Sequence, residues 1–199
     1  MIAETKHCLR NLANFTGRDS RQTFWMYVLA LVIVQFVIGM VMVIPLLWRM
    51  IGQLIETAQA AEAAGGFSDP EQINGAMAGL MGPMMGEMLV WTGIMALVMS
   101  ALFVAAFVRR LHDAGYSGWI ALVPLATQAF ATIYSYSQME RMMALMETAM
   151  ASQDPQAMSQ MQAQIGPWGY VGYIGYLVVI VFGIMDSQAG PNRWGEDPA

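Results

Sequence analysis

The feature that most constrains this chain is a set of four long windows without Asp, Glu, Lys, Arg or His. The windows are residues 22–48, 88–108, 114–139 and 155–185. Each contains an apolar stretch of about 18 residues or more, which is enough for a helix to cross a hydrocarbon core roughly 30 Å thick. Hydrophobic residues make up 57% of the chain and charged residues only 12%, whereas soluble domains have about 45–50% and about 25%. The sequence therefore predicts an integral membrane protein.

We expect an all-α fold, a polytopic membrane protein with four transmembrane helices arranged as two helical hairpins. The 199 residues should form a single membrane domain, because four spans and their connections use the whole length. The predicted transmembrane spans are residues 24–48, 88–108, 118–136 and 168–185. The predicted connections are a cytoplasmic start at 1–23, external helical excursions at 49–87 and 137–167, a cytoplasmic turn at 109–117, and a cytoplasmic tail at 186–199.

The basic residues predict that both ends of the chain are cytoplasmic. In this N-in, C-in orientation seven Lys and Arg residues lie inside, and only Arg49 and Arg141 lie outside. The positive-inside rule counts these residues in short flanking segments and favours this orientation. A largely polar segment precedes the first apolar stretch, so we expect that stretch to remain as a span and not to be a cleaved signal. Cys8 is the only cysteine, which excludes an internal disulfide and gives no metal-site spacing.

The two predicted external excursions resemble each other, which indicates either a duplication of one hairpin or a chance similarity of Ala- and Met-rich segments. Apolar residues recur at helical spacing in both, so we expect the spans to continue outwards as Met-lined helices. Each excursion also has an Asp-Pro pair that is typical of a helix start. The matching elements are residues 54–60 and 145–151, and Asp69-Pro70 and Asp154-Pro155.

The methionines raise the alternative of a Cu(I) site, because thioethers are soft metal ligands. A Met stripe at helical spacing more commonly fills irregular helix contacts, so we predict no metal site and no cofactor. The methionines concerned are Met139, Met142, Met143 and Met146.

Ionisable residues are absent from the centres of the predicted spans, which disfavours a proton-coupled transporter.

Three motif-bearing segments lie at the predicted cytoplasmic ends of the spans, and they would meet at one end of a four-helix bundle. Asp19 or Ser20 can cap the first span, Gly115 can turn the chain, and Ser117 can cap the third span. We predict that these segments form a cytoplasmic cluster with a structural or lipid-contacting role and no catalytic residue. Its members are Phe15, Gly17, Arg18, Ser20, Arg21, Phe24, Trp25, Arg109, Arg110, His112, Asp113, Gly115, Ser117, Gly118, Trp119, Gly190, Asn192, Arg193, Gly195, Asp197 and Pro198.

At these residues the chain resembles the domain-of-unknown-function 805 family of bacterial inner-membrane proteins. The resemblance rests on three ordered motifs, at residues 15–25, 109–119 and 190–198, and by their order it covers nearly the whole chain. The chain departs from the family pattern in its long Met-rich excursions, and in Trp194 and Glu196, where Tyr and Pro are common. The resemblance implies a multi-pass protein of the bacterial inner (plasma) membrane and no established activity.

The basic residues of the cluster have two interpretations. Arg18, Arg21, Arg109 and Arg110 can bind the phosphates of anionic lipids, or they can pair with acids and lock the cytoplasmic segments together. The candidate acids for the second interpretation are Asp113 and Asp197.

We expect a non-enzymatic integral membrane protein whose cytoplasmic Arg/Asp/Asn face organises the helices and contacts lipid headgroups, a membrane protein partner or a second copy of the chain. One alternative is a small-molecule transporter or channel. A second is an enzyme that acts at the membrane surface on a phosphate-bearing substrate. His112-Asp113 lacks a recognised ligand or nucleophile spacing, which disfavours a metal or hydrolase site. The acidic composition and small basic patch disfavour nucleic-acid binding.

Overall fold

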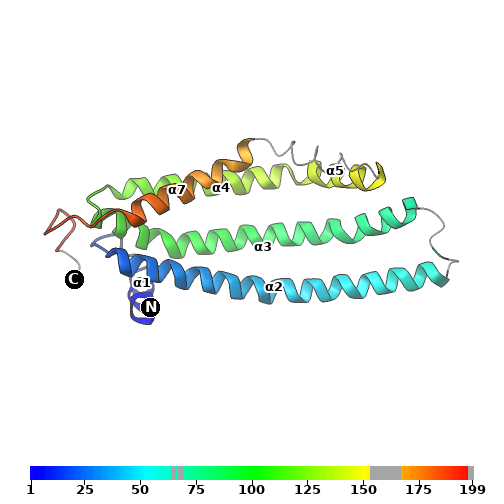
Figure 1. Cartoon of the computed structure of the whole chain (residues 1–199), viewed down its shortest axis with the longest axis horizontal. Coiled ribbons are helices and arrows are strands. Elements are labelled where there is room, and N and C mark those ends of the chain that lie inside the picture. The colour runs from blue at the N-terminus through cyan, green and yellow to red at the C-terminus, as the bar shows by residue number, and fades with distance from the viewer. Residues whose placement is uncertain (64–65, 67–69, 153–166, 197–199) are drawn as a thin grey trace. The chain divides into compact units, whose positions relative to one another are not determined.

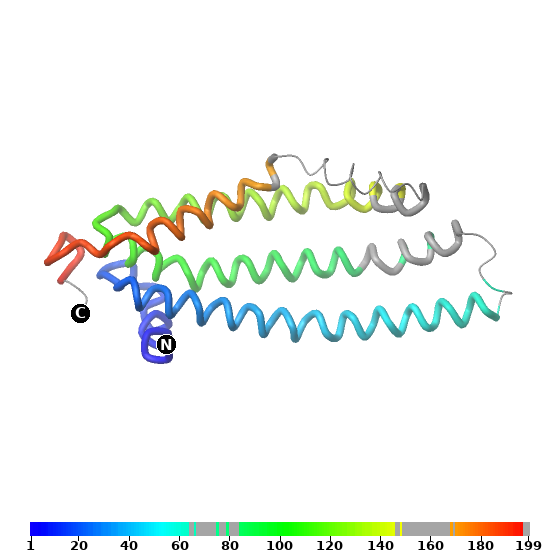
Figure 2. The backbone as a smooth tube through the Cα atoms, in the orientation of Figure 1, coloured from blue at the N-terminus to red at the C-terminus, as the bar shows by residue number. Residues whose placement is uncertain are grey.

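A computed structural model describes residues 1–63, 66, 70–152 and 167–196, and helices dominate this part of the chain (Figures 1 and 2). The only β-pairing among the described residues is an isolated bridge between Asn192 and Gly195. The expectation of an all-α fold is therefore confirmed. The described elements are α1 (Ile2–Arg10), α2 (Arg21–Ala63), α3 (Pro70–Asp113), the 3-10 helix η1 (Gly118–Ala121), α4 (Leu122–Ser137), α5 (Met139–Ser152), the 3-10 helix η2 (Pro167–Tyr170) and α7 (Val171–Ile184).

Two of these helices are long and apolar enough to cross a membrane. They are α2 and residues 84–113 of α3, and their most apolar windows have mean hydropathies of 2.8 and 2.2. Only 6% and 11% of those windows is buried within the structure. A helix in the core of a soluble protein buries its apolar side chains, whereas Phe36 is 68% and Leu97 74% exposed. Apolar surface of this extent is typical of helices that face lipid. α7 is also apolar but shorter.

The helix boundaries locate two features of the predicted spans. Helix α3 continues through Asp113, so that its last five residues occupy part of the predicted cytoplasmic turn. Pro124 belongs to the third predicted span. It lies in the first turn of α4, where a missing N–H does not break the helical ladder. Helix α1 was not predicted. The expected helix caps at Asp69 and Asp154, and the tail residues Asp197 and Pro198, lie outside the described residues.

The described chain divides into two compact units, and the first contains residues 1–37, 93–132 and 170–199. Within it, the start of α2 runs beside the end of α3, and α1 runs across the line of α2 (Figure 2). Aromatic rings form part of its core. The Phe103 ring stacks on the Phe107 ring with centroids 5.3 Å apart, and the Phe24 ring is tilted against Phe107 with centroids 5.9 Å apart. The hydroxyl of Tyr27, which is also fully buried, donates to the Leu102 carbonyl oxygen at 2.9 Å.

The second unit contains residues 38–92 and 133–169. Within it, Arg49 on α2 forms an exposed ion pair with Glu87 on α3, with Nη2 and Oε2 2.7 Å apart. The hydroxyl of Tyr136 on α4 donates to the carbonyl oxygen of Leu89 on α3 at 2.9 Å. This unit contains the predicted external excursions, of which the structure describes residues 49–63, 66, 70–87, 137–152 and 167.

Candidate functional site

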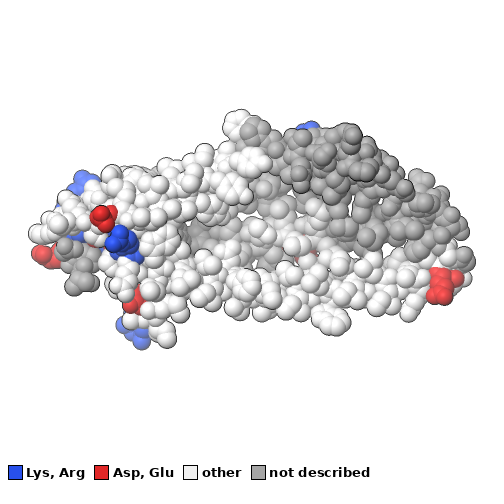
Figure 3. Space-filling model, in the orientation of Figure 1, with Lys and Arg blue, Asp and Glu red and all other residues white. Residues whose placement is uncertain are grey.

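One end of the first unit brings together three segments that are distant in the sequence: residues 11–21, the last turns of α3, and the tail after α7. Charged atoms of this unit gather at the same end on the face shown in Figure 3, where Lys and Arg are blue and Asp and Glu are red. Five buried charged side chains form the centre of the arrangement, which we call the Arg–Asp clasp. Its members are Arg18, Asp19, Arg109, Arg110 and Asp113.

Asp113, the last residue of α3, binds two guanidinium groups. Its Oδ1 accepts a hydrogen bond from Arg18 Nε at 3.1 Å, and Arg18 Nη2 lies 3.0 Å from the same oxygen. Its Oδ2 accepts hydrogen bonds from Arg110 Nη1 and from the hydroxyl of Ser187. The side chains of Asp113 and Arg18 are at most 1% exposed. A charge buried this deeply requires such compensation, because it has lost its hydration.

The same two arginines bind the backbone of the tail that follows α7. Arg18 donates from Nη1 to the carbonyl oxygen of Gly190 at 2.7 Å, and from Nη2 to that of Gln188 at 2.6 Å. Arg110 donates from Nη2 to the carbonyl oxygen of Met185. Each guanidinium therefore joins a carboxylate to main-chain carbonyl groups. The tail is held by its backbone as well as by its side chains.

Asp19 and Arg109 form the second half of the clasp. Arg109 Nε donates to Asp19 Oδ2 at 2.8 Å, and the backbone N–H of Asp19 donates to the Arg109 carbonyl oxygen at 3.2 Å. Arg109 Nη1 also donates to the carbonyl oxygens of Asn11 and Asn14, at 2.8 and 2.7 Å. This half therefore fastens the segment after α1 to the end of α3.

The carboxylate of Asp19 also contacts α1. His7 Nε2 lies 3.1 Å from Asp19 Oδ1, and the thiol of Cys8 donates to Asp19 Oδ2 at 3.7 Å. Burial, followed by the nearby charge of Asp19, raises the pKa of the Cys8 thiol to about 11. The thiolate is the reactive form of cysteine, so this side chain is a packing group and a poor nucleophile.

The C-terminal end of α3 has the geometry needed to present the clasp. Gly115 has φ +84°, a left-handed conformation that glycine adopts without strain. The N–H of Gly115 donates to the His112 carbonyl oxygen, and the N–H of Tyr116 donates to that of Leu111. These two bonds form a Schellman motif that ends the helix immediately after Asp113. The predicted turn at Gly115 is present.

The start of α2 is fixed by its cap and by a close approach of α7. Ser20 Oγ accepts the backbone N–H of Thr23 at 3.3 Å, so Ser20 is the N-cap, which leaves Asp19 free to bind Arg109. The indole N–H of Trp25 donates to the Gly183 carbonyl oxygen at 2.9 Å. A Cβ on Gly183 would lie 2.7 Å from the Trp25 ring, so a side chain at this position would push α7 away.

The end of the tail stacks on α3 through aromatic and cationic groups. The rings of His112, on α3, and Trp194 are stacked with their centroids 4.5 Å apart. The Arg193 guanidinium carbon lies 3.8 Å from the Trp194 ring centroid. The His112 Nδ1 lies 3.3 Å from the Gly17 carbonyl oxygen, and Asn192 Nδ2 donates to the His112 carbonyl oxygen at 3.0 Å. Burial lowers the pKa of His112 below its ordinary value, so the ring is neutral at pH 7.

A groove of about 640 Å³ opens beside this stack. Motif residues form one part of its wall, and aliphatic side chains of α3 and α4 form the other. The lining residues are Phe15, Val104, Val108, His112, Ser117, Gly118, Trp119, Ala121, Leu122, Leu125, Arg193 and Trp194.

The structure brings most of the predicted cluster together, in different roles. Of the four arginines considered for lipid contact, Arg18, Arg109 and Arg110 are buried in the clasp. Arg21 is more than half exposed and pairs with Asp186, with Nη1 and Oδ1 3.2 Å apart. Phe24 belongs to the aromatic core, and Ser117 occupies the N-cap position of η1 without a hydrogen bond from its hydroxyl. The described residues contain no group of three or more His, Cys, Asp or Glu placed to hold a metal ion.

Sequence reasoning missed several members of the site. Asp19 was considered only as a cap, and Gln188 and Ser187 were not considered. Asp19 had one available signal, because it stands between Arg18 and Arg21 in the first motif. The tail residues accept hydrogen bonds largely through their backbone carbonyl oxygens. Because every residue type has this group, the sequence does not show which residues will do so.

Comparison with known proteins places the chain in a family. No curated protein and no solved structure matches it. A family model described as "Protein of unknown function (DUF805)" matches residues 12–196, which include every described part of the clasp. This chain belongs to the DUF805 family.

Proposed function

We propose that this chain is a four-span, N-in and C-in protein of the bacterial inner membrane, and that it has no enzymatic activity. In this proposal the Arg–Asp clasp locks the cytoplasmic segments into one fixed surface, and that surface contacts lipid headgroups or a membrane protein partner. The observation that carries the proposal is the pair of ion-paired networks at one end of the first unit. They join Arg18 to Asp113 across 95 residues and Arg109 to Asp19 across 90 residues.

Helix lengths support four spans. A helix rises about 1.5 Å per residue and a 3-10 helix about 2.0 Å. The four residues of η2 and the 14 of α7 together rise about 29 Å. The four residues of η1 and the 16 of α4 rise about 32 Å. Both lengths match a hydrocarbon core roughly 30 Å thick.

The charged groups of the clasp already bind one another and the backbone, which supports a structural role and not a catalytic one. Both carboxylates already accept hydrogen bonds from buried guanidinium groups, so neither is available as a general base. The buried arginines are likewise engaged by protein groups, and among their described guanidinium nitrogens only Arg109 Nη2 has no hydrogen-bond partner. Contact with headgroup phosphates is therefore assigned to basic side chains at the surface, and Arg21 and Arg193 are the exposed arginines of the motif segments.

Reporter fusions test the orientation and the number of spans. Fusions at Tyr116 and after Ala199 should be cytoplasmic, and fusions at Gly66 and Ala144 should be external. The fusion at Ala144 separates four spans from two, because a protein spanned only by α2 and α3 keeps this residue in the cytoplasm. An external signal at Tyr116, or a cytoplasmic signal at Ala144, rejects the proposed topology.

A further inference from the structure

The groove beside the His112–Trp194 stack changes in polarity along its length. Val104 and Val108 line it on α3, and Leu122 and Leu125 line it on α4. Its other part is lined by polar and aromatic groups of the motif segments, including Ser117 and Arg193. Val104 and His112 are eight positions apart on one helix, so the change from aliphatic to polar lining extends over about 12 Å.

This length matches the depth over which a phospholipid changes from acyl chain to phosphate. In the proposed orientation, the α3 span ends at Val108 and His112 lies at headgroup level. Trp119, which also lines the groove, is 78% exposed. Tryptophan is enriched at the boundary between hydrocarbon and headgroups, because its ring is apolar and its N–H is a donor. The groove therefore lies across that boundary.

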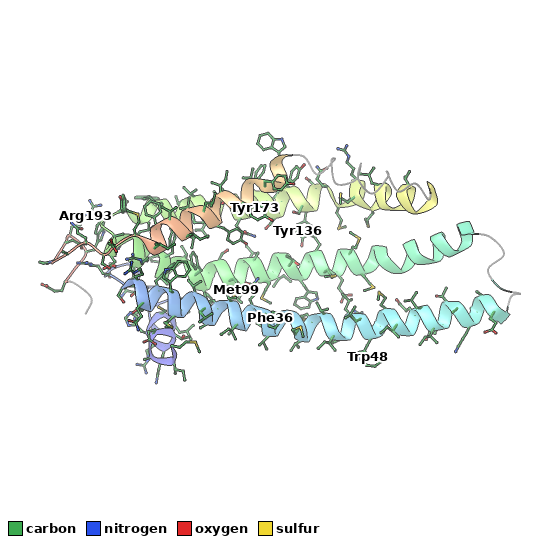
Figure 4. All side chains as sticks on the ribbon, in the orientation of Figure 1. Phe36, Trp48, Met99, Tyr136, Tyr173 and Arg193 are labelled. Atoms are coloured by element: carbon green, nitrogen blue, oxygen red, sulfur yellow. The ribbon has the colours of Figure 1, made fainter. Side chains whose placement is uncertain are left out.

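The charge of the lining selects an anion. The described lining residues include no Asp or Glu, and His112 is neutral at pH 7. Arg193 supplies the only full charge among them, and its guanidinium is held in place over the Trp194 ring. Figure 4 shows Arg193 at the end of the first unit where the tail lies. The Ser117 hydroxyl makes no cap hydrogen bond and is a second donor in the same wall.

We infer that this groove binds one anionic membrane phospholipid, with its phosphate at Arg193 and Ser117 and an acyl chain against Val104, Val108, Leu122 and Leu125. The inference rests on the proposed orientation, which sets the polar part of the groove at headgroup depth. In this inference the lipid is bound by the groove residues and not by the buried arginines of the clasp. Arg193 is positioned through its neighbour Asn192, whose side chain donates to the His112 carbonyl oxygen at the end of α3.

Native mass spectrometry of the full-length protein in a maltoside detergent tests the inference. Titration with dioleoyl phosphatidylglycerol should give one retained lipid per chain, and phosphatidylcholine should bind more weakly. Arg193→Gln should weaken phosphatidylglycerol binding about fivefold, the effect of one near-surface charge. Arg10→Gln is the matched control, because Arg10 is exposed and does not line the groove. It should leave the retained lipid unchanged.

A second pair of variants tests the aliphatic wall. Leu125→Trp should fill the groove and abolish the retained lipid. Leu97→Trp, at an exposed α3 position outside the groove, should not. Equal effects of each variant and its control overturn the inference, as does equal binding of phosphatidylcholine. Binding of glycerol phosphate as tight as that of the lipid indicates a site for a free phosphate compound and also overturns it. Because lipid retention in detergent does not depend on orientation, the reporter fusions can fail independently of this test.

Discussion

Removing the Asp113 charge is the sharpest perturbation of the clasp. Asp113→Asn keeps the size of the side chain but leaves Arg18 and Arg110 as buried cations without their shared carboxylate. Breaking a buried ion pair by removing one partner costs about 3–5 kcal/mol. The variant also places an amide N–H₂ where the carboxylate accepted hydrogen bonds from three donors. We therefore expect the tail after α7 to open locally, and the membrane helices to remain folded.

Hydrogen–deuterium exchange at the Gln188 amide reports this opening, because its N–H donates to the Asp113 carbonyl oxygen at 2.8 Å. A loss of about 3 kcal/mol accelerates exchange through local opening by more than about 100-fold. Asp186→Asn is the matched control, since its ion pair with Arg21 is solvent-exposed. This control should change exchange less than about fivefold. If Asp113→Asn accelerates exchange no more than Asp186→Asn, the clasp does not hold the tail.

Three further predictions concern neighbouring groups. Because the pKa of Cys8 is about 11, only about one thiol in a thousand is ionised at pH 8. Maleimide should therefore label Cys8 slowly in the native protein and rapidly in SDS. Rapid labelling of the native protein would contradict the burial of this thiol. Burial lowers the pKa of His112, so its neutral form contributes stability above pH 6.5 that is lost as the pH falls. The thermal midpoint should therefore decline more steeply below that pH than in His112→Gln, and parallel profiles would exclude this contribution. Gly115→Ala places a side chain at φ +84° and should cost about 1–2 kcal/mol in unfolding experiments, whereas an unchanged stability argues against the left-handed turn.

The sequence predicted the features that depend on local composition. Charge-free windows predicted the apolar stretches of α2 and α3, because a long apolar helix has a signature in a single segment. Gly115 predicted the end of α3 for a similar reason, since few residues adopt a left-handed turn. Asp113, one of the two candidate acids, pairs with Arg18 and Arg110 in the structure.

The pairing of Asp19 could not be predicted from local sequence. Asp19 and Ser20 are both good caps at the start of α2, and the choice between them depends on Arg109, which is 90 residues away. The hydrogen bonds from Arg18 to the tail could not be predicted either, because their acceptors are backbone carbonyl oxygens, which every residue possesses. Helix α1 was missed because residues 1–23 were treated only as a polar cytoplasmic segment, and its burial of Cys8 becomes visible only in three dimensions.

The coupling between Arg18 and Asp113 is the most direct test of the clasp. A double-mutant cycle with Arg18→Gln, Asp113→Asn and the combined variant, read by exchange at the Gln188 amide, measures this coupling across 95 residues. Contacting charges couple by about 0.5–3 kcal/mol, so the combined variant should be less destabilised than the sum of the single variants by at least about 1 kcal/mol. Additivity of the two single effects would contradict the buried ion pair on which the account depends.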